Sequence, residues 1–410
     1  MRRISRNTLI LLLNNAGGAA FSFIGAVVVA RGLGKTGLGQ YAFILAWLTP
    51  FTMLADFGLG TLITRDVARD RSQIAIVLHS ANRTLPFIAG LTLLLSLLAI
   101  LITGASPAIS AALGLGSLLI VLDPWYGLYT AAFRAFEQMQ PILIVNVGGL
   151  ALQLALTVWL IQIGTGILGA VTAVIVVNIG QLAVIWLWWR SWQRAIPSTV
   201  SGNLSYIQTE RLILIRRAAP FALAAVIGAV AVRLNVLLLD RLAGDAATGQ
   251  YSAASRFVEA GRLLPNAVFG AFFPAMAALS ANATAFKRFF RRGALTLGGL
   301  SALLALGLTL SAPLLIRLSY GPTFDDAVPV LVLLCWSLLP ATGRGLLSLA
   351  LYGAGREGLV NRVGIFTLFL QAGIGTVSVA TFGAMGAAVT AILTESAALA
   401  TLWWLSRSLL

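Results

Sequence analysis

Long apolar runs alternate with short polar connections along almost the whole 410-residue chain. Each run approaches or exceeds the roughly 20 residues that a helix needs to cross the hydrocarbon layer of a membrane. The pattern predicts an all-α polytopic membrane protein with twelve transmembrane helices. The predicted spans cover residues 8–30, 38–63, 84–103, 109–132, 142–163, 167–189, 218–239, 251–279, 294–316, 327–353, 359–381 and 384–405.

The basic residues between these spans predict the orientation, because lysine and arginine beside a span stay on the cytoplasmic side during insertion. Twenty of the 28 lysines and arginines fall on one side of the predicted membrane, whereas the other side holds only Arg31, Lys35, Arg241 and Arg317. The basic side is predicted to be cytoplasmic. Since the alternation persists along the chain, we expect a multi-pass protein of the cytoplasmic (inner) membrane with both termini in the cytoplasm.

The composition, 59% hydrophobic and 10% charged, excludes an ordinary soluble domain. The net charge of +15 is then mainly a topology signal and an attraction to anionic membrane lipids, so no nucleic-acid partner is expected. The chain has one cysteine, Cys335, and one histidine, His79, which exclude an intrachain disulfide and a cysteine or multi-histidine metal cluster. The sequence contains no Walker A or zinc motif, and we expect no cofactor or metal.

The longest cytoplasmic connection, residues 190–217, divides the chain into two halves of six predicted spans each. We therefore predict an N-terminal lobe of residues 1–189 and a C-terminal lobe of residues 218–410, arranged as parallel repeats. Within the connection, residues 208–217 carry apolar residues among arginines and predict an amphipathic segment at the membrane surface.

A short internal repeat supports this division. Residues 31–41 align without gaps with residues 241–251, an offset of 210, and both stretches follow the first predicted span of their half. The identical pairs are Arg31 and Arg241, Gly34 and Gly244, Gly39 and Gly249, Gln40 and Gln250, and Tyr41 and Tyr251.

Ionised side chains inside the predicted spans are the main functional candidates, because each one needs a partner, a wet cavity or a ligand. At about 100° per residue, four polar residues of span 251–279 share an arc of about 120°. They are Arg256, Glu259, Arg262 and Asn266. With Arg233 of the preceding span they predict a net-cationic, substrate-binding wall. The alternative is structural: Arg256 and Arg262 neutralise Glu259, and Arg233 pairs with Asp240.

The other intramembrane charges look more isolated in the sequence. Arg344 is a further substrate-binding candidate, and Asp56, Asp123 and Glu395 are candidates for ion coupling or gating. For each of them a structural hydrogen bond between helices is at least as good an interpretation. Arg31 and Arg65 stand at span ends, where gating competes with simple snorkelling of the side chain to the interface.

Several motifs, in their order on the twelve-span frame, resemble those of one transporter family. They are Gly39-Gln-Tyr41, Asp56-Phe-Gly-Leu-Gly60 followed by Thr64-Arg65, Pro124-Trp-Tyr126 leading to Arg134-Ala-Phe-Glu-Gln-Met139, and Gly249-Gln-Tyr-Ser-Ala-Ala-Ser-Arg256 with Pro274 further along. Over nearly its whole length the chain resembles the oligosaccharide flippases of the polysaccharide transport family, within the multidrug/oligosaccharidyl-lipid/polysaccharide (MOP) exporter superfamily.

This resemblance implies two six-helix lobes around a central cavity that opens alternately to either side of the membrane. It also implies a polyprenyl-pyrophosphate-linked oligosaccharide as substrate, held by cavity arginines such as Arg256, and glycan polymerase or glycosyltransferase partners. The first span carries Asn14 and Asn15 but no charge, which departs from the more cationic members. A multidrug or other lipid exporter of the same superfamily is the alternative function, and an integral membrane enzyme acting on lipid-linked glycans is a further one.

Overall fold

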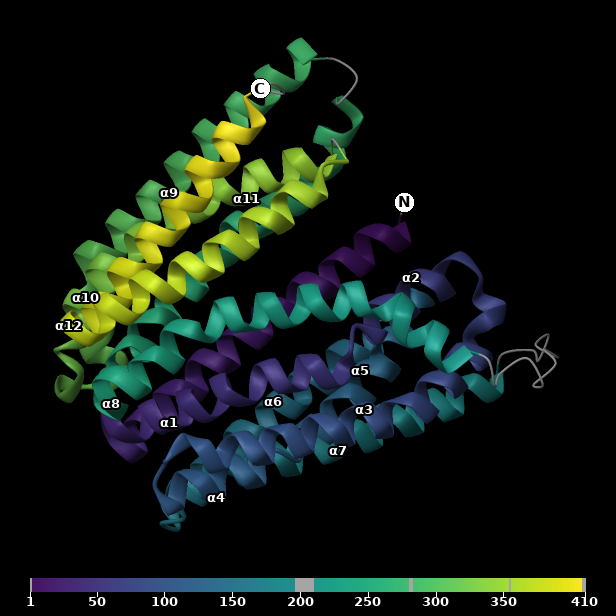
Figure 1. The fold of residues 1–410 in the computed structure, drawn as a ribbon, viewed down its shortest axis with the longest axis horizontal. Helices are drawn as coiled ribbons and strands as arrows, with labels where there is room; N and C mark the ends of the chain where they lie inside the picture. Colours follow the sequence, from purple (N-terminus) through teal and green to yellow (C-terminus); the bar gives the residue numbers. More distant parts are fainter. Residues whose placement is uncertain (1, 196–209, 280–282, 354, 408–410) are drawn as a thin grey trace. The chain divides into compact units, whose positions relative to one another are not determined.

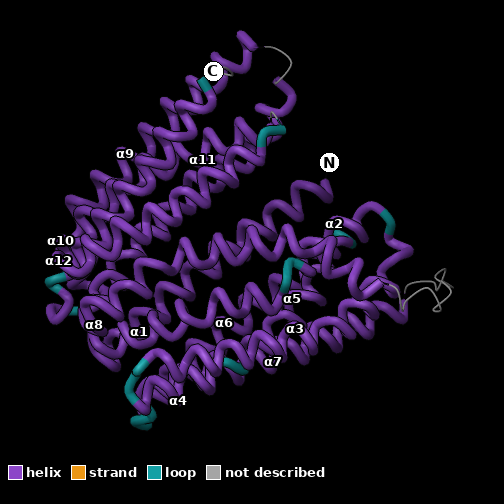
Figure 2. The backbone as a smooth tube through the Cα atoms, in the orientation of Figure 1, coloured by secondary structure: helices purple, strands orange, loops and turns teal. Residues whose placement is uncertain are grey.

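The computed structural model describes residues 2–195, 210–279, 283–353 and 355–407. Within these ranges every regular element is a helix, and short connections join the helices (Figures 1 and 2). The chain forms two compact units. The first comprises Met1–Gly32 and Ile44–Arg233, and the second comprises Leu33–Phe43 and Leu234–Leu410. A segment of the first half of the sequence is therefore part of the second unit.

Nine helical stretches of the described chain are long and apolar enough to cross a membrane. Three of them, Ile10–Asp56, Ile213–Asn266 and Gly358–Ser406, contain 47, 54 and 49 residues, about twice the length that one crossing needs. Each is interrupted by a glycine with positive φ: Gly34 at 70°, Gly244 at 82° and Gly383 at 55°. All three breaks fall between two of the predicted spans, so the chain is a multi-pass membrane protein.

The first unit is a helical bundle built mainly by the helices before residue 196. Their bounds are α1 (Arg2–Asp56), α2 (Leu59–Arg69), η1 (Arg71–Gln73), α3 (Ile74–Thr103), α4 (Pro107–Gly116), α5 (Leu119–Ala135), α6 (Met139–Gln162) and α7 (Gly166–Ala195). The unit also includes the first part of α8 (Glu210–Leu279). Helix α5 contacts α2, α3 and α7, and α6 lies against α7 (Figure 1).

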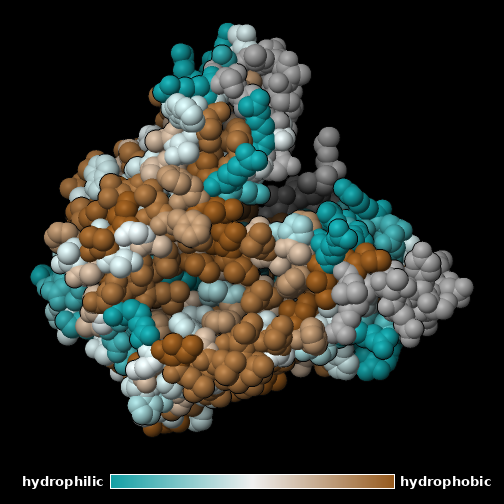
Figure 3. All heavy atoms as spheres, viewed as in Figure 1, coloured by the Kyte–Doolittle hydropathy of each residue, from teal (hydrophilic) through white to brown (hydrophobic). Residues whose placement is uncertain are grey.

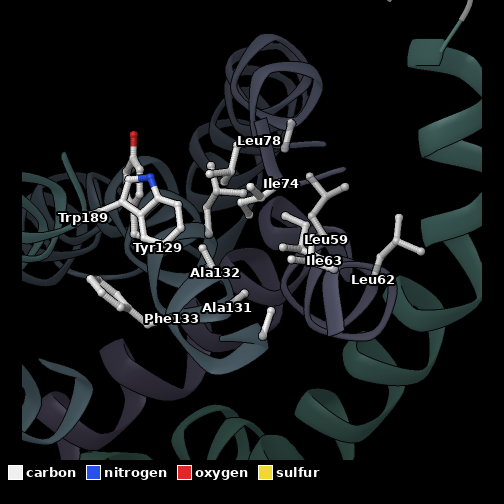
Figure 4. Close-up of a cluster of buried hydrophobic side chains, with 14 of the residues drawn as sticks. Leu59, Leu62, Ile63, Ile74, Leu78, Tyr129, Ala131, Ala132, Phe133 and Trp189 are labelled. Atoms are coloured by element: carbon white, nitrogen blue, oxygen red, sulfur yellow. The ribbon is translucent and has the colours of Figure 1, made fainter. Parts of the chain in front are cut away.

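A buried apolar cluster holds α2, α3, α5 and α7 together. Leu59 and Ile63 of α2 pack near Leu78 of α3, and Phe133 of α5 lies edge-on against Trp189 of α7 with ring centroids 5.2 Å apart (Figure 4). The same cluster receives Leu214 and Ala218 from the start of α8. The short helix α2 is thus anchored on its apolar side and can present its charged residues outward.

The second unit contains the rest of α8 together with α9 (Ala283–Tyr320), η3 (Pro322–Phe324), α10 (Ala327–Leu334), η4 (Cys335–Ser337), α11 (Leu338–Gly353) and α12 (Glu357–Ser406). Helix α11 contacts α9 and α12, and α10 contacts the same two helices. Phe290 of α9, Leu346 of α11 and Leu402 of α12 belong to one buried cluster.

Large apolar side chains cover much of the outer surface of the helices. Leu101 is 79% exposed, Leu310 is 75% exposed and Phe369 is 72% exposed. On the face seen in Figure 3, hydrophobic residues cover the sides of the helices, and hydrophilic residues gather near helix ends. Exposed apolar area on this scale is what a lipid-facing surface requires.

Three predicted boundaries need correction. The predicted span 38–63 ends at Asp56, because Phe57 and Gly58 adopt positive φ and break the helix. Residues 109–132 belong to two helices, α4 and α5, which are separated at Ser117 and Leu118. In the predicted amphipathic segment, residues 208 and 209 lie outside the described residues, and residues 210–217 form the first turns of α8 rather than a separate helix.

Candidate functional site

Three charged residues that are far apart in the sequence meet in the second unit. Arg344 of α11 donates two hydrogen bonds to Glu395 of α12, from Nε to Oε2 at 2.5 Å and from Nη2 to Oε1 at 3.3 Å. Arg262 of α8 reaches the same carboxylate, with Nη2 3.7 Å from Oε1. One glutamate therefore links two arginines on two other helices, and we call these residues the arginine triad.

Arg344 and Glu395, which look more isolated in the sequence, are each other's partners, and their contact is the hydrogen bond between helices that was the alternative interpretation. The expectation that Arg262 neutralises Glu259 needs correction, because the structure places the Arg262 guanidinium beside Glu395 of another helix. A helical face tells which residues point the same way. It does not tell which helix comes to lie opposite.

The second charged pair of this unit lies within α8. Arg256 Nη1 is 3.0 Å from Glu259 Oε2, an i,i+3 ion pair in which the arginine is mostly covered and the glutamate is about half exposed. Asn266, four residues beyond Arg262, is exposed. The face predicted from α8 thus contributes to two charge groups, Arg256 with Glu259 and Arg262 with the triad.

Arg233 and Asp240 lie on α8 on opposite sides of the boundary between the two units. The Arg233 side chain is half-buried. Its predicted roles, in substrate binding or as the partner of Asp240, stay predictions.

In the first unit, Asp56 is the last residue of α1 and precedes the turn into α2. Its carboxylate lies beside the backbone of Gly58 and Gly60 at the start of α2, and Arg134 supplies positive charge nearby. The first amides of a helix have no partner within the helix, so an acceptor at this place stabilises the start of α2. This contact gives Asp56 a structural role, and its coupling or gating role stays a prediction.

The other acidic candidate of this unit is Asp123 of α5. It accepts a hydrogen bond from Asn178 Nδ2 of α7 at 2.8 Å. In the same unit, Asn146 of α6 donates to Asn14 of α1 at 2.9 Å. These bonds are the interhelical polar contacts expected of such residues in a membrane.

Arg65 lies on α2 and is exposed. Its Nε donates to Asp66 Oδ1 at 2.9 Å, and its guanidinium carbon stands 5.2 Å from the ring centroid of Phe221 in α8. Arg217 of α8 donates to the other oxygen of Asp66 at 2.7 Å. Helix α2 is therefore joined to the start of α8 by Arg217 through Asp66 and by Arg65 over Phe221. The sequence interpretation did not single out Asp66.

Arg31 is exposed and precedes the break at Gly34. This break lies in the first stretch of the internal repeat, and the break at Gly244 lies at the equivalent place in the second stretch. Residues 33–43 cross residues 244–251 within the second unit, an arrangement that we call the glycine crossing. A Cβ on Gly39 would overlap the carbonyl oxygen of Asp245, and a Cβ on Gly249 would overlap that of Lys35. Each contact maps onto the other by the 210-residue offset, so the backbones meet reciprocally where only glycine fits.

Polar side chains reinforce the glycine crossing. Gln40 Nε2 donates to Asp245 Oδ2 at 2.8 Å, while Lys35 Nζ and Gln250 Nε2 reach Asp326 Oδ2 at 3.4 Å and 3.1 Å.

A further ion pair precedes α10 in the same unit. Asp325 accepts two hydrogen bonds from Arg317, which lower the pKa of this carboxyl from its ordinary value.

A family model described as "Polysaccharide biosynthesis protein" matches residues 4–280, more than half of the chain. The chain belongs to this family. The comparison with curated protein sequences gives no significant match.

Solved structures show the fold of this polysaccharide biosynthesis protein. It is similar to an inward-facing multidrug resistance MATE family transporter of the MOP superfamily, at 16% identity, with a TM-score of 0.78 over 95% of this chain and 94% of the other. It is also similar to the lipid II flippase MurJ in an inward closed conformation, at 12% identity, with a TM-score of 0.77 over 97% and 87%. A MOP superfamily transporter from Pyrococcus furiosus, for which a reverse polarity of the binding pocket has been described, matches at 16% identity, with a TM-score of 0.66 over 99% and 95%.

The family model therefore gives the family of this polysaccharide biosynthesis protein, and the solved structures show that it has the fold of MOP superfamily transporters. Among the described residues no group of three or more histidine, cysteine, aspartate or glutamate side chains is arranged to hold a metal ion. The charged side chains that meet in the second unit remain the main candidates for a functional site.

Proposed function

We propose that this protein is a flippase that moves a polyprenyl-pyrophosphate-linked oligosaccharide across the cytoplasmic membrane by alternating access. The product would serve surface polysaccharide or glycan assembly, with glycosyltransferases supplying the cargo and a glycan polymerase using it. The polysaccharide biosynthesis family supports this proposal, as does the similarity in fold to a lipid II flippase.

The observation that carries the proposal is the surplus of positive charge inside the second unit. Inside the predicted spans 251–279, 327–353 and 384–405, the described side chains contribute three arginines, Arg256, Arg262 and Arg344, but only two acids, Glu259 and Glu395. Arginine presents a planar fork of N–H donors that fits phosphate oxygens, so an excess of arginine favours a diphosphate. Acidic side chains would be expected in an exporter of cationic drugs.

The twelve-span architecture belongs to the same proposal. Each of the three long stretches would cross the membrane twice, with its turn at Gly34, Gly244 or Gly383, which raises nine stretches to twelve crossings. Two lobes, residues 1–189 and 218–410, would then enclose a central cavity that opens alternately to the two sides. An even number of crossings places both termini on one side, and the arginine-rich connections make that side the cytoplasm.

The direct test is transport by the purified full chain in proteoliposomes that contain a fluorescent polyprenyl-pyrophosphate-linked oligosaccharide. We expect label in the outer leaflet to become protected from a membrane-impermeant reductant faster than in protein-free vesicles. Parallel vesicles containing ethidium test the drug-exporter alternative. Ethidium transport without movement of the lipid-linked sugar would reject the flippase proposal in favour of drug export.

The orientation can be tested with single cysteines in a chain whose Cys335 has been replaced by alanine. Thr323 lies in η3 and Ser72 in η1, and both side chains are exposed. In intact cells Thr323→Cys should react with a membrane-impermeant maleimide, whereas Ser72→Cys should react only after the membrane is opened. Labelling of Ser72→Cys alone in intact cells would reverse the predicted topology.

A further inference from the structure

The arginine triad already contains a bound anion, the side chain of Glu395. Its two oxygens meet the Nε and Nη2 of Arg344, and this is the two-point geometry with which arginine also binds phosphate. The carboxylate of Glu395 therefore binds the same two N–H donors that a phosphate group would bind. Unlike a diphosphate, it brings only a single negative charge.

One carboxylate does not satisfy the two arginines. The shorter contacts all go to Arg344, and Arg262 stands 3.7 Å from the same glutamate, beyond hydrogen-bond distance. The Nε of Arg262 is buried without a hydrogen-bond partner among the described residues. The triad therefore has one more positive charge than negative charges, and one of its N–H donors has no acceptor. This arrangement is costly in a membrane unless a second anion binds there.

The two arginines of the triad are more exposed than the glutamate that they hold. Arg344 and Arg262 are 40% and 41% exposed, whereas Glu395 is only 16% exposed. An anion from outside the protein can thus reach both arginine side chains, and it would draw the buried Nε of Arg262 into the contact. It meets the glutamate as a competitor for the same donors.

The three residues stand on three helices, so the competition has a mechanical consequence. While Glu395 holds Arg344 and Arg262, it ties α12 to α11 and α8. When a ligand takes over the two arginines, these ties are released. The pair of Arg256 and Glu259 differs, because both residues lie on α8 and their separation leaves helix packing unchanged.

We propose that Glu395 is an internal counter-anion that occupies the arginine site in the absence of cargo and is displaced by the diphosphate group of the cargo. This inference rests on the proposed function. Glu395 then acts as a specificity-determining residue, because a ligand with at least two negative charges outcompetes it and a monoanion does not. Its displacement couples occupancy of the site to the contacts between α12, α11 and α8.

The test measures binding of inorganic pyrophosphate to the full chain in detergent by calorimetry. Glu395→Gln removes the competing charge but keeps the size of the side chain. We expect about tenfold tighter binding, because a site that its own side chain closes most of the time binds in proportion to its open fraction. The matched control, Asp325→Asn, removes a carboxylate that accepts two hydrogen bonds from Arg317 outside the site, and it should change the affinity by less than about twofold. Arg344→Gln should abolish binding.

Acetate provides the second measurement. It should compete with pyrophosphate in Glu395→Gln but not in the unmodified chain, where the built-in carboxylate is already present at high effective concentration. If Glu395→Gln does not fold, Glu395→Asp, which retracts the carboxylate by one methylene, should give an intermediate gain in affinity.

Pyrophosphate binding that is unchanged or weaker in a folded Glu395 variant would show that the ion pair is a fixed structural link and would overturn the inference. So would absence of binding in all variants. The transport assay separates this result from the proposed function: flipping without a gain in affinity refutes only the counter-anion, and a gain in affinity without flipping refutes only the flippase.

Discussion

Replacing Arg256 by alanine is expected to abolish transport while the protein remains folded in the membrane. As a phosphate-binding residue in a desolvated site, it contributes an interaction whose loss costs about 2 to 5 kcal/mol, or on the order of 100-fold in transport. Its ion pair with Glu259 lies within one helix, where such a pair stabilises the fold by only about 0.2 to 0.5 kcal/mol. Surface-glycan display and the melting temperature of the detergent-solubilised chain measure the two effects separately.

Two further variants distinguish cargo binding from a purely structural pair. Arg256→Lys should restore only part of the transport, because an ammonium group lacks the bidentate fork. Combining Arg256→Gln with Glu259→Gln removes both partners, so the double variant leaves no unpaired charge and should recover any stability that either single change loses. It should nevertheless remain inactive. Normal transport by the alanine variant, or by the double variant, would remove Arg256 from the site.

Gly249→Val is expected to prevent stable folding of the second unit. A Cβ at this position would overlap the backbone oxygen of Lys35, and it would stand 3.2 Å from the backbone nitrogen of Gly39. Backbone atoms cannot rotate away as a side chain can, so we expect a cost at or above the upper end of overpacking, about 3 kcal/mol. The measurement is the melting temperature and the monodisperse fraction on size-exclusion chromatography.

Gly307→Val is the matched control, since a Cβ at Gly307 in α9 would meet no atom within 4 Å. Gly39→Val, the reciprocal change, should reproduce the defect of Gly249→Val. Equal melting temperatures for Gly249→Val and Gly307→Val would show that the two backbones do not need their close approach.

The features that could be predicted from the sequence are those set by local pattern. Apolar runs predicted the membrane helices, and a glycine break lies between the predicted spans of each long stretch. The repeat around Gly39 and Gly249 predicted equivalent positions but not the contact between them. That contact forms between residues that are separated by 210 positions in the sequence. No local rule predicts that the fold brings them together.

The arginine triad was beyond sequence reasoning for the same reason. Residue 262 lies on a predicted polar face with Glu259, yet its partner is Glu395, the only charged residue within the last predicted span. An acid without a neighbour of opposite sign on its own helix signals a partner on another helix. The sequence does not say which helix. In contrast, the role of Asp56 beside Gly58 and Gly60 is local, and helix-start chemistry gave a clue that the sequence interpretation missed.

The glycine crossing also constrains the order in which this protein can fold. Residues 33–43 leave the ribosome 210 residues before their counterparts at 243–253, which at about 5 to 20 residues per second is a wait of roughly 10 to 40 s. During that time the first unit can assemble, but residues 33–43, which belong to the second unit, have no native surface to pack on. The second unit therefore cannot mature as an independent domain during synthesis, because part of it was made first and must be kept available until the middle of the chain arrives.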